Sequence, residues 1–390
     1  MLRFLVLIFS IVFYQSVSCQ KLITRADAVQ SALNNQTNLK ASALTLQQQQ
    51  ELWKGSAALE SPQLQLQLSP YDEGAQVGVQ QNISFPAVYR SRKSLQSERI
   101  RLAQLQLQGT QNELKRAVEI SYLGLQYLIE KTRLLVYQDS IYSAIKIASK
   151  RFFDAGQINK LEELQASMQA DAIHNDLVRT QMDSEGEKQI FYFYTNYKDS
   201  IKPTPLETYA FVAVQDTVIS NVQQEILKQQ IAINQKELKV AIASLLPELQ
   251  AGVLFPTISQ SQRAVGYQFG LTIPVWRKQN RSRIAAAKTG MEIATAQQEL
   301  EQQRLNAQYK QAANNYGKEL QSLTYYNNTA LPQAKAIIET SQRLFQGGEL
   351  NYIESLRNLQ SAFDILMSHL ETHRSYNETV INLNYLNGTL

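Results

Sequence analysis

The stretch AVGYQFGLTIPVWRKQNRSR, residues 264–283, dictates how the rest of this chain is interpreted. In its first half, large apolar residues alternate with small or polar ones; they are Val265, Tyr267, Phe269, Leu271 and Ile273. Successive side chains of a strand point to opposite faces, so this pattern predicts a strand with one apolar face. Pro274 ends the strand because it has no N–H to donate. Trp276 and the basic cluster 277–283 follow, and a long polar helical pattern begins there. This order predicts a strand that leaves a bilayer for water.

The N-terminus has the pattern of a secretory signal peptide, which we assign to residues 1–19. A single positive charge, Arg3, precedes an apolar run over residues 4–14 that only Ser10 interrupts. The small residues Ser16 and Ser18 then mark a cleavage region. The pattern therefore predicts an exported protein.

Cys19 is the only cysteine of the chain. It either leaves with the signal peptide or lies at the cut, or it becomes the lipidated N-terminus of the mature chain. In every case the mature chain has no disulfide and no cysteine-based metal site. The net charge of +4 is small for 390 residues, so no nucleic-acid partner is predicted.

The first part of the mature chain, residues 20–200, is predicted to contain three helical segments and two strands. The helical patterns cover residues 22–60, 87–155 and 160–197, and Thr24 is the expected N-cap of the first. The strands are expected at 63–69, where Leu and Gln alternate strictly, and at 75–85.

The second part, residues 201–390, repeats this order. After a predicted linker at 198–205, its elements are a helix over 207–246, strands over 248–255 and 264–273, a long helix over 277–345 and a return helix over 351–386. Pro332 is expected to kink the long helix.

An internal duplication relates the two parts. The segment RFFDAGQINKLEELQA, residues 151–166, aligns with RLFQGGELNYIESLRN, residues 343–358. Each copy reads helix, β-hairpin, long helix and return helix, and such a repeat fixes the architecture. Two copies supply four strands, which is too few to close a membrane barrel without open edges. Several chains must therefore pool their strands, and three chains would supply twelve.

The duplicated unit resembles the TolC-like outer-membrane efflux proteins of Gram-negative bacteria. The resemblance is carried by the order of loose motifs over the whole mature chain, and three segments show it best: 331–362, 84–92 and 272–283. It implies a mainly α fold with a small β component, assembled as a homotrimer. The trimer would form a long α-barrel in the periplasm and a shared 12-stranded transmembrane β-barrel in the outer membrane. It implies a passive conduit for small solutes, drugs or metal ions, that docks onto a periplasmic adaptor (membrane fusion) protein and an inner-membrane pump.

The same resemblance implies roles for residues at the helix turns. The expected adaptor-docking tips are Ala155, Gly156, Gln157, Gly347, Gly348 and Glu349. The expected periplasmic gate consists of Glu354, Arg357 and Phe345. Glu354 keeps the acidic character of the family's narrow end, whereas Arg357 departs from it, which suggests a Glu–Arg pair between subunits in place of a doubly acidic ring.

Other residues suggest contact with the membrane surface, and two histidines are considered as metal ligands. Tyr89, Arg90, Trp276 and Arg277 follow the second strand of each hairpin and are interpreted as membrane-interface anchors. His369 and His373 share one helix face, but no third ligand lies near them in sequence, so no metal site, cofactor or enzymatic activity is predicted.

One rival interpretation stays open from sequence. Long helical hairpins also occur in non-membrane periplasmic coiled-coil adaptors or scaffold proteins. The two interpretations differ in a simple property, since an adaptor would stay soluble and monomeric without detergent.

Overall fold

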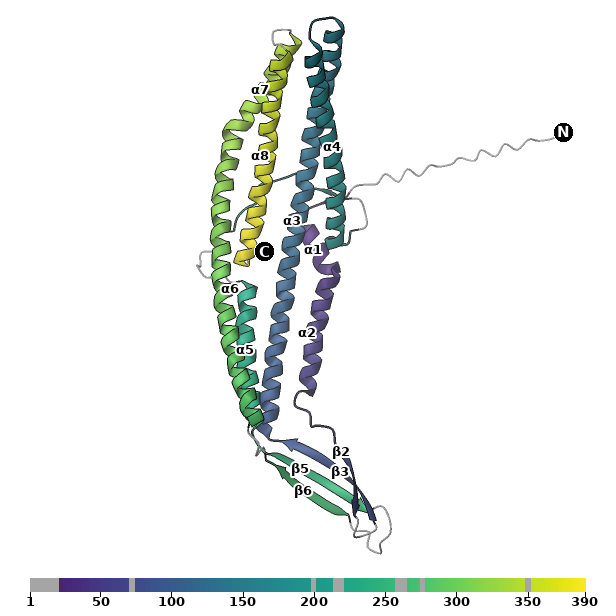
Figure 1. The fold of residues 1–390 in the computed structure, drawn as a ribbon, viewed down its shortest axis with the longest axis vertical. Helices are drawn as coiled ribbons and strands as arrows, with labels where there is room; N and C mark the ends of the chain where they lie inside the picture. The colour runs from purple at the N-terminus through teal and green to yellow at the C-terminus, as the bar shows by residue number, and fades with distance from the viewer. Residues whose placement is uncertain are drawn as a thin grey trace, which may run out of the picture.

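The computed structural model describes residues 21–69, 74–197, 201–212, 221–256, 265–273, 278–347 and 352–390. Long helices run side by side along the molecule, and one small sheet lies at one end (Figure 1). The chain is thus mostly helical with a small β component, as the sequence predicts.

The first half starts with a short strand and ends with a helical hairpin. Its elements are β1 (Lys21–Ile23), α1 (Arg25–Asn35), α2 (Thr37–Gly55), β2 (Gln63–Ser69), β3 (Gly74–Ser84), α3 (Pro86–Asp154) and α4 (Lys160–Thr195). Thr24 caps α1, because its hydroxyl accepts from the Asp27 N–H at 3.2 Å while the Asp27 carboxylate accepts the Thr24 N–H.

The second half has the same order with a shorter first helix. Its elements are β4 (Ile201–Pro203), α5 (Val222–Ala243), β5 (Glu248–Pro256), β6 (Gly266–Thr272), α6 (Lys278–Tyr325), a π-helical turn η1 (Tyr326–Ala330), α7 (Leu331–Gln346) and α8 (Tyr352–Asn387). Pro332 lies in the first turn of α7, directly after η1. A proline has no N–H to donate to the carbonyl four residues earlier. The regular α-helical hydrogen bonding is therefore interrupted before Pro332, and the wider π turn η1 lies at this interruption.

Two expectations about helices are wrong in detail. The helical pattern over 22–60 is split, because Gln36 is extended and its side-chain oxygen caps α2 by accepting the Thr37 N–H at 2.8 Å. The helix expected from residue 207 begins only at Val222. Residues 207–212 are not helical and belong to the segment described next.

Residues 201–212, here called the strap, bind the two halves of the chain together. Within them β4 pairs in parallel with β1, so the expected linker is partly a strand. Further along, the Tyr209 N–H donates to Asn377 Oδ1 of α8 at 2.9 Å, and the Tyr209 hydroxyl donates to Gln126 Oε1 of α3 at 2.9 Å. Gln126 Nε2 also donates to the Thr204 and Pro205 carbonyls, so side chains of α3 and α8 satisfy backbone groups of the strap without a helix.

The sheet joins the two hairpins in the order β2-β3-β5-β6, and all its neighbours are antiparallel. The strands β2 and β6 therefore form its two edges. The apolar cores lie in the helical body instead, and the most enclosed side chains include Tyr122, Phe191 and Phe363.

Candidate functional site

The four-stranded sheet has one apolar and one polar face. Paired residues lie on the same face, so the strand register assigns each side chain. The apolar face contains Leu64, Leu66, Val77, Val79, Ile83, Leu249, Ala251, Val253, Phe255, Tyr267, Phe269 and Leu271. Gln81 shares this parity but turns its amide to the Glu60 carbonyl at 2.7 Å. Among the side chains that the structure describes, the other face is built from Gln, Asn, Ser, Thr and Gly, apart from Glu248 and Leu254.

The apolar face of this sheet is exposed, which is unusual for a water-soluble protein. On that face Phe269 is 82% and Leu64 is 78% exposed. On the polar face Gln80 is only 5% exposed, whereas Gln63, Gln67 and Gln268 are exposed. A contiguous exposed apolar surface of this kind marks contact with a partner or a membrane.

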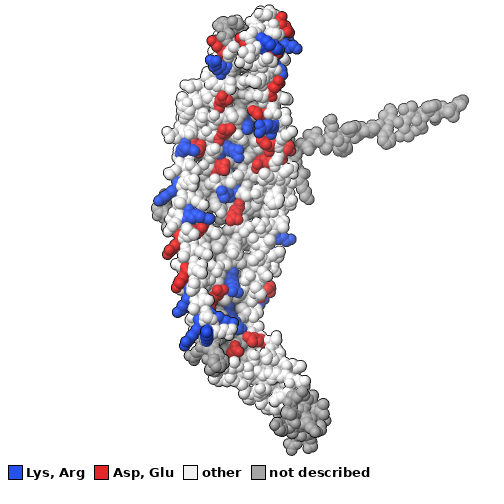
Figure 2. Space-filling model, viewed as in Figure 1, with Lys and Arg blue, Asp and Glu red and all other residues white. Residues whose placement is uncertain are grey.

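Aromatic and basic residues lie where the sheet meets the helices. The Ser84 N–H donates to the Tyr89 hydroxyl at 3.0 Å, and Arg90 is exposed beside it. Both line a cavity of about 480 Å³ next to Phe85 and Leu249. Trp276 and Arg277 lie outside the described residues. Figure 2 shows Lys and Arg gathered at this end of the helical body, whereas the visible sheet surface is almost free of charge.

Trp53 is an aromatic residue near the sheet that the sequence analysis did not single out. It belongs to α2, and the Lys93 ammonium lies 4.3 Å from its ring centroid. Its indole N–H donates to Ser97 Oγ at 3.1 Å. The signal in the sequence is a tryptophan that precedes the first hairpin, as Trp276 follows the second.

The helical turn between α3 and α4 has the geometry of a Schellman motif. Gly156 has a positive φ of 71°, and its N–H donates to the Phe153 carbonyl at 2.9 Å. The Gln157 N–H donates to the Phe152 carbonyl at 2.8 Å, and Ala155 forms the helix C-cap. This pattern closes α3 by satisfying its last carbonyl groups. Glycine is required because its φ is unfavourable for other residues.

The turn between α7 and α8 is described only in part. Gly347 is the C-cap of α7, and its N–H donates to the Arg343 carbonyl at 3.0 Å. Gly348 and Glu349 lie outside the described residues, as does Cys19. Phe345 makes an edge-on ring contact with Phe152 at 6.4 Å between centroids. The ends of the two helical hairpins, which lie at the same end of the molecule (Figure 1), therefore touch through aromatic side chains.

The two charged gate candidates lie near the start of α8. Glu354 is in its first turn and Arg357 is three residues further along, and both side chains are exposed. Their exposure leaves them accessible to a neighbouring copy of the chain or to a solute.

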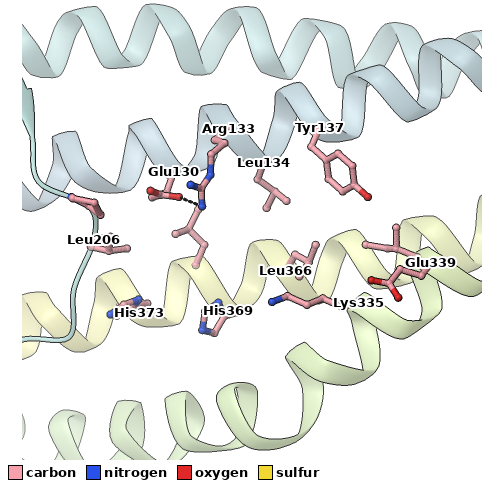
Figure 3. Close-up of a pocket in the computed structure, with 13 residues that line it drawn as sticks. Glu130, Arg133, Leu134, Tyr137, Leu206, Lys335, Glu339, Leu366, His369 and His373 are labelled. Atoms are coloured by element: carbon pink, nitrogen blue, oxygen red, sulfur yellow. Dashed lines mark ion pairs between the residues drawn. The ribbon is translucent and has the colours of Figure 1, made fainter.

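A second cavity, of about 670 Å³, lies between the two halves (Figure 3). Side chains of α3, α7, α8 and the strap converge on it, among them the ion pair of Glu130 with Arg133 at 2.7 Å. His369 Nε2 lies 2.9 Å from Asn327 Oδ1 of η1, and His373 Nε2 lies 3.1 Å from Thr208 Oγ1 of the strap. Burial lowers the pKa of both imidazoles; Lys335 adds to this at His369, and His369 adds to it at His373.

Two features are absent from the described part of the chain. No group of three or more His, Cys, Asp or Glu side chains there is arranged to hold a metal ion. Among the helices that the structure describes, none combines the length and the apolar character needed to cross a bilayer.

The sequence matches no protein-family model and no curated protein at a significant level. Its structure, however, is similar to several solved bacterial channels. The outer membrane channel CmeC of Campylobacter jejuni matches with a TM-score of 0.79 and 12% identity, over 94% of this chain and 85% of that one. The outer-membrane channel OprN matches with a TM-score of 0.78 and 14% identity, over 94% and 90% of the two chains. The outer membrane protein VceC of Vibrio cholerae matches with a TM-score of 0.76 and 11% identity, over 93% and 96%.

Likeness at this level of identity concerns the fold, and it extends over nearly all of each chain. The duplicated helices, the small two-faced sheet and these similarities agree with one another. The chain has the fold of the TolC-like outer-membrane channels.

Proposed function

We propose that the protein is the outer-membrane channel of a tripartite efflux system, a passive conduit without catalytic activity. The observation that carries this proposal is the two-faced sheet, whose apolar face is exposed at Phe269 and Leu64. Hydrocarbon around the apolar face and water against the polar face would stabilise this arrangement, because transmembrane strands alternate in the same way. The fold shared with known outer membrane channels supports it.

The assembly follows from the sheet edges. In one chain β2 and β6 have no further partner strand in the described sheet, and backbone groups unpaired in hydrocarbon each cost several kcal/mol, roughly 2–7. Pairing β6 of one copy with β2 of the next removes both edges. Three copies of four strands close a 12-stranded barrel, and the duplicated helices of three copies surround a tunnel below it.

The helical part then extends into the periplasm. The turns at Ala155–Gln157 and at Gly347–Glu349 form its far end, where a periplasmic adaptor and an inner-membrane pump would dock. Tyr89, Arg90, Trp276 and Arg277 would anchor the chain at the periplasmic surface of the membrane. The cargo class we favour is small solutes, drugs or metal ions, which is an expectation from the family resemblance.

The decisive experiment is extraction followed by reconstitution. The protein should require detergent for extraction from the outer membrane, should run as a trimer, and should conduct ions in a planar bilayer. A protein that stays soluble and monomeric without detergent, and that never conducts, would be an adaptor or scaffold instead.

The gate assignment has its own test. Contact between Glu354 of one copy and Arg357 of the next would hold the tips together, so Glu354→Ala and Arg357→Ala should each raise the single-channel conductance. A matched control is the pair Asp176→Ala and Arg179→Ala, which are also three residues apart but lie on α4. Unchanged conductance and ion selectivity in both gate variants would contradict the assignment.

A further inference from the structure

The polar face of the sheet is almost uncharged. The sequences of the four described strands are QLQLQLS, GAQVGVQQNIS, ELQAGVLFP and GYQFGLT, and they contain one Asp, Glu, Lys or Arg side chain, Glu248. Glu248 lies in the last row of the sheet, beside Ser84 and Thr272, where the strands meet the helices. The rows beyond it present amides and glycines, together with Leu254.

The amides of this face bond to one another. Gln65 Nε2 donates to Gln80 Oε1 at 2.6 Å, and Gln80 Nε2 donates to Asn82 Oδ1 at 3.3 Å. On the other hairpin, Gln250 Nε2 donates to Thr272 Oγ1 at 2.9 Å. An amide offers donors and an acceptor in one neutral group, so a surface of linked amides can solvate an anion or a cation equally.

Glycines keep this surface shallow. A Cβ at Gly270 would lie 2.8 Å from Gln250 Oε1, and a Cβ at Gly252 would lie 3.1 Å from the Val79 carbonyl oxygen. Side chains at these two positions would push the amides off the sheet into the space beside it. With glycine there, the amides stay close to the backbone and the space stays open.

Pores that sort ions by sign do so with rings of charged side chains. In a trimer each charged residue of the polar face would become a ring of three, yet the described rows beyond Glu248 contribute none. We infer that the barrel wall does not select its cargo by charge, so that anionic, cationic and neutral solutes pass it alike and size sets the limit. This inference rests on the proposed channel function and adds to it the class of solute that the outer-membrane segment accepts.

The test uses the absence of cysteine from the strands. The chain has one cysteine, Cys19, so labelling of the unsubstituted protein gives the background. Gln268→Cys on the polar face and Tyr267→Cys on the apolar face are expressed in cells. Each is then treated from outside with an anionic and with a cationic methanethiosulfonate, the sulfonatoethyl and the trimethylammonioethyl reagents. Rates are divided by the rate of the same reagent with a free small thiol.

We expect Gln268→Cys to react with both reagents at normalised rates that agree within about threefold, since screening leaves little of the field of a distant charge. A preference of tenfold or more for either reagent would overturn the inference. Failure of the channel proposal gives a different result, in which Tyr267→Cys reacts as readily as Gln268→Cys because neither residue lies in lipid.

A second variant shows that the face surrounds the passage. Gln80 lies in the same row of the sheet as Gln268, with Gly252 between them. Adding Gln80→Lys to Gln268→Cys places three ammonium groups around that row and should favour the anionic reagent by about tenfold at low ionic strength. An unchanged ratio would overturn the inference, because the face would then not enclose the path of the solute.

Discussion

The sheet exposes its large apolar side chains, whereas the helical body buries them. Phe269 of the sheet is 82% exposed, whereas Phe363 of the body is 2% exposed and packs against Tyr142. The body is therefore stabilised by its own packing. If the proposed function holds, the sheet is stabilised instead by hydrocarbon outside it and by neighbouring copies at its edges.

The largest effect is expected when charged residues are placed on the apolar face of the sheet. Phe269→Arg with Leu271→Arg should abolish insertion, because an arginine costs about 2–4 kcal/mol near the bilayer midplane, less toward the interface, and every copy carries both. The measurement is the amount of trimer recovered from the outer membrane fraction.

The matched control for this change is Gln268→Arg, which directly precedes Phe269 on the opposite face of the strand and should insert. Gly270 is a poor control because any side chain there would meet Gln250. If Gln268→Arg blocks insertion and the double variant does not, the two faces have been assigned the wrong way round.

A cavity in the helical body should destabilise the protein by nearly as much free energy as a charge on the apolar face of the sheet costs for insertion. Phe363 lies in the core cluster with Ile145 and Leu359, so Phe363→Ala should destabilise the chain by about 3–5 kcal/mol. Phe255→Ala on the apolar face of the sheet removes the same group from lipid contact and should cost much less. Thermal unfolding of the detergent-solubilised protein, followed by helical circular dichroism, compares them, and equal losses would contradict the distinction between the two regions.

Sequence was sufficient where structure depends on near neighbours. Alternation over a few residues predicts that the segment around Phe269 is extended, because period two suits only a strand. The glycine of the α3–α4 turn is predictable because φ = 71° at Gly156 excludes most other residues. The two-faced character of the sheet also follows from alternation alone.

The sequence did not predict the structures that depend on contacts between residues far apart in the chain. The strap looks helical from residue 207 onward, yet Tyr209 is held by Gln126 and by Asn377, residues 83 and 168 positions away. Local propensity carries no information about such contacts. The break at Gln36 depends on a single side chain capping its own neighbour, which competes closely with a continuous helix. The cavity with its two histidines also needed the packing of α3 against α8.

Removing the buried amide of Asn377 in the body should have an intermediate effect on stability, larger than removing an amide of the sheet. Asn377 is fully buried, accepts the Tyr209 N–H at 2.9 Å and donates to the Glu207 carbonyl at 2.7 Å. Asn377→Ala leaves both strap groups unsatisfied, and each should cost about 1–3 kcal/mol. Gln268→Ala removes an amide that faces water and should be nearly neutral. Thermal unfolding measures both, and faster proteolysis within the strap should accompany the first; a neutral Asn377→Ala would mean that the strap does not hold the halves together.

The smallest expected effect is a dependence of stability on pH that resides in the body. Burial lowers the pKa of His369 and of His373 below the ordinary value of 6.5. Around them lie charged groups of the strap, α3, α7 and α8, namely Glu207, Glu130, Arg133, Lys335, Glu339, Glu371 and Arg374. In the unfolded chain the two imidazoles bind a proton at a higher pH than in the folded chain. The folding stability that depends on the neutral histidines is therefore fully present above pH 6.5, and it is lost as the pH falls toward their lowered pKa values.

The unfolding temperature should therefore fall between pH 7.5 and pH 5, and His369→Gln with His373→Gln should reduce that fall. His174→Gln is the control, since this exposed residue lies outside the cavity and pairs with Asp139 at 3.4 Å. The described strands contain no histidine, so the loss should appear in the helical signal while the trimer stays in the membrane. An equal fall in the double variant and in the unsubstituted protein would place the pH dependence on other groups, and dissociation of the trimer at the same pH would place it at the contacts between copies.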